Sequence, residues 1–201
     1  RRHTYISKTG KMGCNKTTSE RGNRLAVFLP LWHEPLPHIL LAPKALRDIH
    51  TLRKCCGKHE IGFLGSVKKI DDTTYLIQQT FIPPQRVGKY HCEFEQRSLG
   101  TFYYDLLSRE KTGVQLANSL LFWGHIHPNN DVRPSIQDEA QMSRFSHNEF
   151  FIRGIFGKAM GVIFTVFNYK NRIQIIDCPW DVASMSNTKR EAELLAEMRN
   201  K

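Results

Sequence analysis

Two histidines, His125 and His127, flank a single apolar residue at the end of a mostly apolar run. In a β-strand the side chains of residues i and i+2 point to the same side, so both imidazoles can reach one metal ion while Ile126 points into the core. Pro128 then stops the strand, and sites in α/β sheets usually open at strand ends. The pattern therefore predicts a pair of metal ligands at the end of a buried strand.

Asp138 completes this predicted site, in the stretch Ser135-Ile136-Gln137-Asp138. The connection after His127 is long enough to swing the next helix back over the strand end, which places Asp138 one turn into that helix. Two histidines and one carboxylate are ligands that zinc prefers, and they leave a fourth position open for water, as in hydrolytic sites. Ser135 and Asp138 also have the spacing of a helix capping box, which could position the aspartate.

Hydrolysis needs a carboxylate that is not a ligand, because the attacking water must lose a proton and the leaving amine must gain one. We assign this general base to Glu60, and Ser135 could donate a hydrogen bond to the oxyanion. Glu60 could instead be an exposed acid at the start of a strand. Glu93 and Glu95 are its rivals, and they could also bind substrate or simply be solvated.

Other polar residues have less specific interpretations. Cys92 could be a nucleophile, but nothing near it in the sequence would orient it apart from His91. Asp131 and Arg133 could line a substrate groove or cap a loop. Phe122 and Trp123 are expected in the core, and three histidines are interpreted as surface residues: His59, His91 and His147.

The elements that must position these residues alternate along the chain. Strands are expected at 25–32, 38–41, 60–68, 74–82, 118–126, 149–156, 159–168 and 171–177. Helices are expected at 43–56, 97–111, 135–146 and 189–199, and a loop at 83–95. This alternation predicts an α/β fold, with a mixed β-sheet flanked by helices.

Charge divides the chain unevenly. The net charge is +10 over 201 residues, and residues 1–24 hold seven basic side chains against one acidic one. We expect 1–24 to be a disordered basic leader, solvated or touching nucleic acid or an acidic partner. Residues 25–201 would form one domain that ends in a helix. No apolar run approaches the roughly 18–20 residues that a membrane span needs, so no membrane partner is expected.

The five cysteines are an odd number and include no Cys-x-x-Cys pair. This argues against a disulfide framework and favours a reducing, cytoplasmic location.

Taken together, the site residues resemble the motif of the JAB/MPN (JAMM) family of zinc metallopeptidases, in the form of a bacterial stand-alone domain. That motif is a Glu, a long interval, His-x-His-Pro and then Ser-x-x-Asp; it is matched here by Glu60, His125, His127, Pro128, Ser135 and Asp138. The resemblance covers about residues 25–178. The segment 42–65 is similar to the family's opening helix and strand, although the Gly-rich run after Glu60 is shorter here.

The resemblance implies a three-layer MPN/JAB architecture of the cytidine-deaminase-like type, with Zn²⁺ held by His125, His127 and Asp138. It also implies cleavage after the C-terminal tail of a ubiquitin-like or sulfur-carrier-like protein, whose extended tail would run near Glu60. Two other interpretations stay open. One is a non-catalytic interaction module of the same fold. The other is a nucleic-acid-associated protein similar to the bacterial RadC group, which has a comparable His-x-His-Pro signature.

Overall fold

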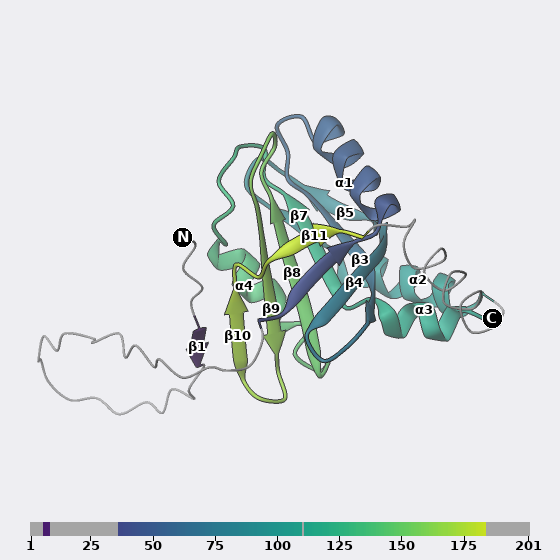
Figure 1. The fold of residues 1–201 in the computed structure, drawn as a ribbon. Helices are drawn as coiled ribbons and strands as arrows, with labels where there is room; N and C mark the ends of the chain where they lie inside the picture. Colours follow the sequence, from purple (N-terminus) through teal and green to yellow (C-terminus); the bar gives the residue numbers. More distant parts are fainter. Residues whose placement is uncertain (1–5, 9–35, 110, 184–201) are drawn as a thin grey trace, which may run out of the picture.

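The computed structural model describes residues 6–8, 36–109 and 111–183 of the chain (Figure 1). Its strands are β1 (Ile6–Lys8), β2 (His38–Leu41), β3 (Ile61–Lys69), β4 (Thr74–Phe81), β5 (Gln85–Val87), β6 (Cys92–Phe94), β7 (Phe122–Ile126), β8 (Phe150–Phe156), β9 (Val162–Asn168), β10 (Ile173–Ile176) and β11 (Trp180–Val182). Its helices are α1 (Pro43–Cys55), α2 (Gln96–Leu107), α3 (Gly113–Ser119) and α4 (Ile136–Ser143). The fold is therefore α/β, as the alternation of elements predicted.

A mixed sheet forms the centre of the described part, in the order β1-β10-β9-β8-β7-β3-β4-β2-β11. Strand β7 lies in its middle, antiparallel to β3 and parallel to β8. Every residue of β7 is buried, which explains why its sequence is nearly continuously apolar. The strand that carries His125 is thus supported by a neighbouring strand on each side.

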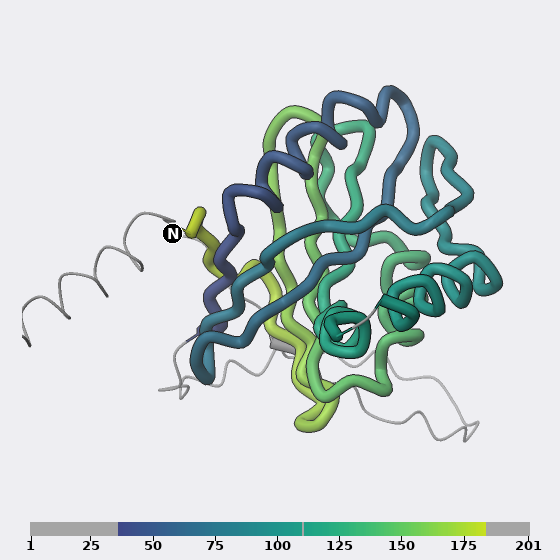
Figure 2. Tube along the Cα trace, turned by 90° about the vertical axis from the view of Figure 1, so that its right-hand side faces the viewer, coloured from purple at the N-terminus to yellow at the C-terminus, as the bar shows by residue number. Residues whose placement is uncertain are grey.

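Helices cover both faces of the sheet (Figures 1 and 2). Helix α1 packs its buried residues Ala45, Ile49 and Leu52 against one face, in a cluster that includes Phe63 and Ile126. Residues of α2, α3 and α4 pack on the opposite face, in a cluster built around Trp123. The alternation along β7 assigns Ile126 to the α1 face and Trp123 and His125 to the α4 face.

Gly124 allows β7 to lie this close to its neighbours. A Cβ at this position would lie 2.4 Å from the ring of Phe63, on the α1 face of the sheet. A side chain would therefore displace either Phe63 or the strand that carries His125 and leads directly to His127.

Most predicted elements are confirmed, with boundaries shifted by a few residues. The predicted loop 83–95 is wrong in part, because β5 and β6 form a small antiparallel hairpin there. The predicted strand 118–126 begins only at Phe122, because α3 occupies the residues up to Ser119. Strand β11 was not predicted; it pairs in parallel with β2.

The structure describes only part of the two chain ends for which predictions were made. Residues 6–8 were expected to be disordered, and this prediction is wrong. They form β1, which pairs antiparallel with β10 at the edge of the sheet and gains its hydrogen bonds there. The rest of the predicted leader 1–24, the predicted strand 25–32 and the predicted helix 189–199 lie outside the described residues. None of the described helices combines the length and the apolar composition needed to cross a membrane.

Candidate metal centre

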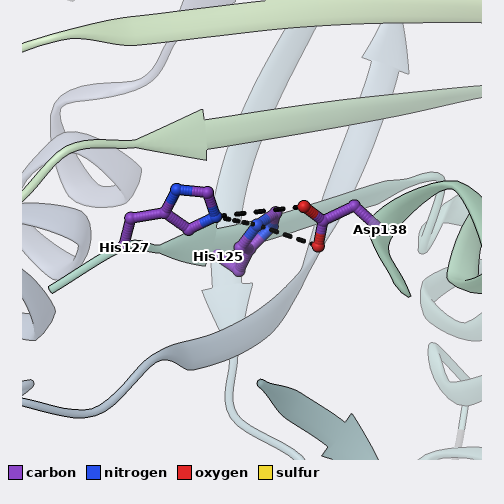
Figure 3. A group of neighbouring side chains, drawn as sticks. All are labelled: His125, His127 and Asp138. Carbon is purple, nitrogen blue, oxygen red and sulfur yellow. Dashed lines mark hydrogen bonds and ion pairs between the residues drawn. The ribbon is translucent and has the colours of Figure 1, made fainter. Parts of the chain in front are cut away.

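The two histidines lie side by side at the end of β7 (Figure 3). His125 is the fourth residue of the strand and has no exposed surface. His127 follows the strand, but its backbone N–H still donates to the carbonyl oxygen of Phe156 in β8, at 2.9 Å. Their Nε2 atoms lie 2.9 Å apart. The strand end therefore brings both imidazoles to one point, as the spacing predicted.

Asp138 approaches the histidines from the first turn of α4. Its Oδ1 lies 3.2 Å from Nε2 of His125, and its Oδ2 lies 3.9 Å from Nε2 of His127 (Figure 3). The predicted capping box is confirmed, because the Asp138 N–H donates to Oγ of Ser135 and the Ser135 N–H donates to Oδ2 of Asp138. The aspartate thus caps its own helix and faces the histidines. One ligand atom from each of the three residues lies within 4.8 Å of the others.

The protonation states suit metal binding. Burial disfavours the Asp138 carboxylate, but hydrogen bonds from His125 and Ser135 outweigh it and lower its pKa to about 2. Burial also lowers the pKa of His125, so that its imidazole is neutral at pH 7. A neutral imidazole and an ionised carboxylate are the forms in which these side chains coordinate metal ions.

A backbone carbonyl orients His127. Its Nδ1 lies 2.5 Å from the carbonyl oxygen of Asp131, and since a carbonyl only accepts, Nδ1 carries the proton and Nε2 is left free to coordinate. The Asp131 carboxylate in turn accepts hydrogen bonds from the backbone and the guanidinium of Arg133. The sequence left two roles open for Asp131 and Arg133, lining a substrate groove or capping a loop. Their hydrogen bonds are those of a loop cap.

Stacking orients His125. Its ring lies on the indole of Trp123, with centroids 4.5 Å apart and the planes inclined by 19°. Trp123 is 2% exposed, which confirms its predicted place in the core and adds a role that the sequence did not indicate. The other ring nitrogen of His125, Nδ1, is buried and has no hydrogen-bond partner among the described residues.

Glu60 lies immediately before β3, at the rim of this group. Its Oε1 is 3.9 Å from Nε2 of His127, and only 9% of the residue is exposed. Burial, together with the negative charge of Asp138, raises the pKa of Glu60 to about 7. A carboxyl group with this pKa can both accept and release a proton near neutral pH.

A cleft of about 340 Å³ opens beside the group, between β6 and α4. Glu60, Trp123 and Asp138 line it, together with Glu93 of β6 and Arg144, which follows α4. Nη2 of Arg144 and Oε1 of Glu93 form an ion pair at 3.1 Å. Arg144 was not singled out from the sequence, because a basic residue in the last turn of a predicted helix is common and has no specific functional meaning.

The remaining candidates are less well suited to chemistry. Glu93 lines the cleft, whereas Glu95 is ion-paired with Arg86. Cys92 also lines the cleft, but burial raises the pKa of its thiol, which opposes the thiolate that a nucleophile requires. The prediction of surface histidines is confirmed for His59, His91 and His147, which are all exposed.

Arg153 is a further residue that the sequence reasoning missed. It is fully buried on β8, and its Nη1 lies 2.8 Å from Oε1 of Glu139, the residue after Asp138. Its guanidinium also lies over the ring of Phe167. A single charged residue within the apolar run of 150–156 was the signal that could have revealed it.

Comparison with known proteins gives a fold but no family. No family model matches the sequence, and no curated protein matches it. The fold is similar to the solution structure of protein DSY2949 from Desulfitobacterium hafniense, with a TM-score of 0.51 and 14% sequence identity over 75% of this chain and 97% of that one. At this level of identity the likeness concerns the fold alone.

Proposed function

We propose that this protein is a zinc-dependent peptidase or isopeptidase of the JAMM type. Its substrate would be a ubiquitin-like or sulfur-carrier-like protein, cleaved after its C-terminal tail. The observation that carries the proposal is the meeting of two imidazoles and an ionised carboxylate with a fourth group, Glu60, whose pKa is raised to about 7. Helices on both faces of the sheet are compatible with the three-layer MPN/JAB architecture, which is part of the same proposal.

Zn²⁺ fits the donor atoms that the chain supplies. Two imidazole nitrogens and a carboxylate oxygen are a usual ligand set for a catalytic zinc site. The Asp131 carbonyl and the helix cap at Ser135 hold two of the ligands in the required orientation. A bound zinc ion would supply a Lewis acid and lower the pKa of the attacking water towards neutrality.

Proton transfer is assigned to Glu60. Its carboxylate accepts a proton from the attacking water and returns it to the amine that leaves. Both steps need a pKa near the working pH, and the burial that gives Glu60 this pKa also keeps bulk water away from the side chain. The Ser135 hydroxyl accepts a hydrogen bond from the Asp138 N–H, so its own proton is free to be donated to the oxyanion.

The cleft between β6 and α4 favours an extended peptide as the substrate. Its volume of about 340 Å³ accommodates a few residues of chain and no folded domain. Glu60 and Asp138 are among its lining residues, so a tail that lies in it would bring a peptide bond close to the proposed metal centre. The body of the carrier protein would remain outside.

We also assign the reaction to the cytoplasm. The cysteines in the described ranges, Cys55, Cys56, Cys92 and Cys178, are free thiols. A reducing compartment maintains thiols in that state.

The test combines metal content with cleavage. We expect purified protein to contain one zinc ion per chain and to cleave at least one member of a panel of ubiquitin and sulfur-carrier fusions, as measured by intact-protein mass spectrometry. Chelation by 1,10-phenanthroline should abolish cleavage. Glu60→Gln should keep the zinc and lose about two orders of magnitude in rate or more, as expected when a general base is removed.

Glu149→Gln is the matched control, because it makes the same change at an exposed position that lies outside the cleft and away from the metal ligands. It should retain the zinc and most of the rate. A Glu60→Gln protein that cleaves at the wild-type rate would exclude Glu60 as the base, and a wild-type protein that binds no zinc would contradict the proposal as a whole.

A further inference from the structure

Within the described residues, the strand that leads away from Glu60 has no neighbouring strand along part of one edge. Strand β3 pairs with β4 only from Leu64 onward, where Leu64 lies opposite Phe81. Before that point its one strand neighbour in the described part of the chain is β7, which it pairs with through residues 61–63. The free edge lies directly beside the general base proposed above, so whatever occupies it influences where the base lies.

A side chain from β5 takes the place of the missing strand. The Gln85 carboxamide accepts a hydrogen bond from the Gly62 N–H at 2.8 Å and donates one to the Gly62 carbonyl oxygen at 2.7 Å. An amide that both donates and accepts in this way reproduces the two hydrogen bonds that a residue of an antiparallel strand would make. Gly62 is two residues from Glu60.

The β5–β6 hairpin holds Glu60 itself as well. The Glu60 N–H donates to the carbonyl oxygen of Gly88 at 2.8 Å, and the Gly88 N–H donates to the carbonyl oxygen of His91, which closes the hairpin turn. The backbone is therefore attached to the hairpin both at Glu60 and at Gly62.

The hairpin also packs closely against the start of β3. A Cβ on Gly62 would lie 3.2 Å from Sγ of Cys92 and 3.3 Å from Cζ of Phe94, so a larger residue there would require these side chains to shift by a few tenths of an ångström. Phe94 is 3% exposed and belongs to the core on the α4 face of the sheet. The hairpin is thus fixed to the core on one side and to the start of β3 on the other.

We propose that Gln85 is a positioning residue, which holds the start of β3 and thereby keeps the Glu60 carboxylate at its distance from the metal ligands. This inference rests on the proposed function, in which Glu60 is the general base. Cys92 and Glu93 of the same hairpin line the substrate cleft. A substrate tail therefore contacts the element that holds the base, and an ordered hairpin is needed both to bind the tail and to transfer the proton.

Gln85→Met tests the proposal, because methionine keeps the length of the side chain and removes both hydrogen bonds. The matched control is Gln78→Met, the same change at an exposed position of β4. In Gln85→Met we expect kcat on the fastest-cleaved fusion to fall about tenfold to a hundredfold, the range that a misplaced catalytic group produces. KM should stay within about threefold, and zinc affinity, measured by competition with a chromogenic chelator, within about twofold.

Hydrogen exchange gives a second measurement that does not depend on activity. The Gly62 and Glu60 amides should exchange at least about tenfold faster in Gln85→Met, with His125 and the rest of β7 unchanged. Gln78→Met should match the wild type in every measurement.

Three results would overturn the proposal. The first is a wild-type kcat in Gln85→Met together with fast exchange at Gly62, which would show that loss of the Gln85 hydrogen bonds does not affect the catalytic position of Glu60. The second is unchanged exchange at Gly62, and the third is an equal loss of zinc affinity and kcat, which would indicate general damage to the site. If the wild type cleaves no fusion, the proposed function fails, and the exchange measurement alone decides whether Gln85 holds β3.

Discussion

Burial and hydrogen bonding set the protonation states of three residues of the site: Asp138, His125 and Glu60. Asp138 is held ionised by hydrogen bonds, and His125 is held neutral by burial. Glu60 is buried beside the negative charge of Asp138, which raises the pKa of its carboxyl group to about 7. Two carboxyl groups within one small site therefore differ in pKa by several units, as expected of an acid–base pair with separate roles.

This difference predicts how Glu60 affects stability. Its pKa is raised from 4.5 to about 7 on folding, so the folded state binds the proton more tightly, and that contribution to stability is lost as the pH rises from 4.5 through 7. Glutamine is neutral throughout. In zinc-free protein we expect Glu60→Gln to raise the free energy of unfolding by on the order of 2 kcal/mol at pH 8 and to leave it nearly unchanged at pH 4.5.

Urea unfolding in the presence of EDTA at the two pH values measures this effect. Glu93→Gln, in the same cleft but exposed, should show the same small difference from wild type at both. A stabilisation by Glu60→Gln that is independent of pH would show that burial does not shift the Glu60 carboxyl group.

At the scale of elements, α4 has to remain in register with the sheet, because it carries one ligand and β7 carries another. Two contacts on adjacent residues do this: Asp138 faces the histidines, and Glu139 forms the ion pair with buried Arg153 of β8. Arg153 is fully buried while the Glu139 side chain is 47% exposed. Removing Glu139 would therefore leave a buried charge unpaired, whereas removing Arg153 would leave a partly exposed one.

We expect Glu139→Gln to be more destabilising than Arg153→Met. The first change leaves a buried guanidinium without its counter-ion, which costs on the order of 3 kcal/mol, whereas the second replaces the buried charge with an apolar side chain. Equilibrium unfolding in urea measures both. The double variant should be more stable than Glu139→Gln alone, and a double variant that loses the sum of the two single effects would contradict this account.

Glu149→Gln is the control for that comparison. It removes an ion pair with Lys170 in which both side chains are about 70% exposed. Such pairs contribute about 0–1 kcal/mol, so this variant should unfold close to the wild type.

The sequence predicted the elements whose signals are local. The apolar run of β7, the capping box of α4 and the two strands that flank the Asp71-Asp72 turn, β3 and β4, each depend on neighbouring residues, and all were located within a few positions. Strands β5, β6 and β11 have three residues each, too few for alternation to be visible. Strand β11 forms along the edge of β2, and β5 and β6 form a hairpin that is held against β3 by the Gln85 side chain, so both depend on the assembled sheet.

The same distinction applies to the site. His125, His127 and Asp138 were found because a strand and a capped helix fix their directions from spacing alone. Gln85 and Arg153 act through partners that are distant in the chain, Gly62 and Glu139, and no spacing connects them. For Gln85 the sequence contains no signal, since its role depends on where β4 leaves β3.

For the molecule as a whole, the proposed metal ligands come both from the sheet and from α4, so an ion bound by them should stabilise the fold. A ligand at about one hundred times its dissociation constant adds about 2.7 kcal/mol, which corresponds to a rise in Tm of roughly 5–10 °C for a domain of this size. We expect this difference between zinc-saturated and EDTA-treated protein in a thermal unfolding scan.

Asp138→Asn should lose most of the response to zinc, and His147→Ala, which changes an exposed histidine outside the metal-binding group, should keep it. Equal Tm values for wild-type protein with zinc and with EDTA would contradict the assignment of these residues as ligands.

The three proposed metal ligands come from one short segment, 125–138, whereas Glu60 lies far upstream and reaches the site only through the pairing of β3 with β7. Closing a short loop costs little chain entropy, so the three ligands can stay together in a chain in which only β3 is displaced from β7. A destabilised variant would then retain zinc and yet be inactive. Metal content and activity therefore report on different parts of folding: one on a local loop, the other on the assembled sheet.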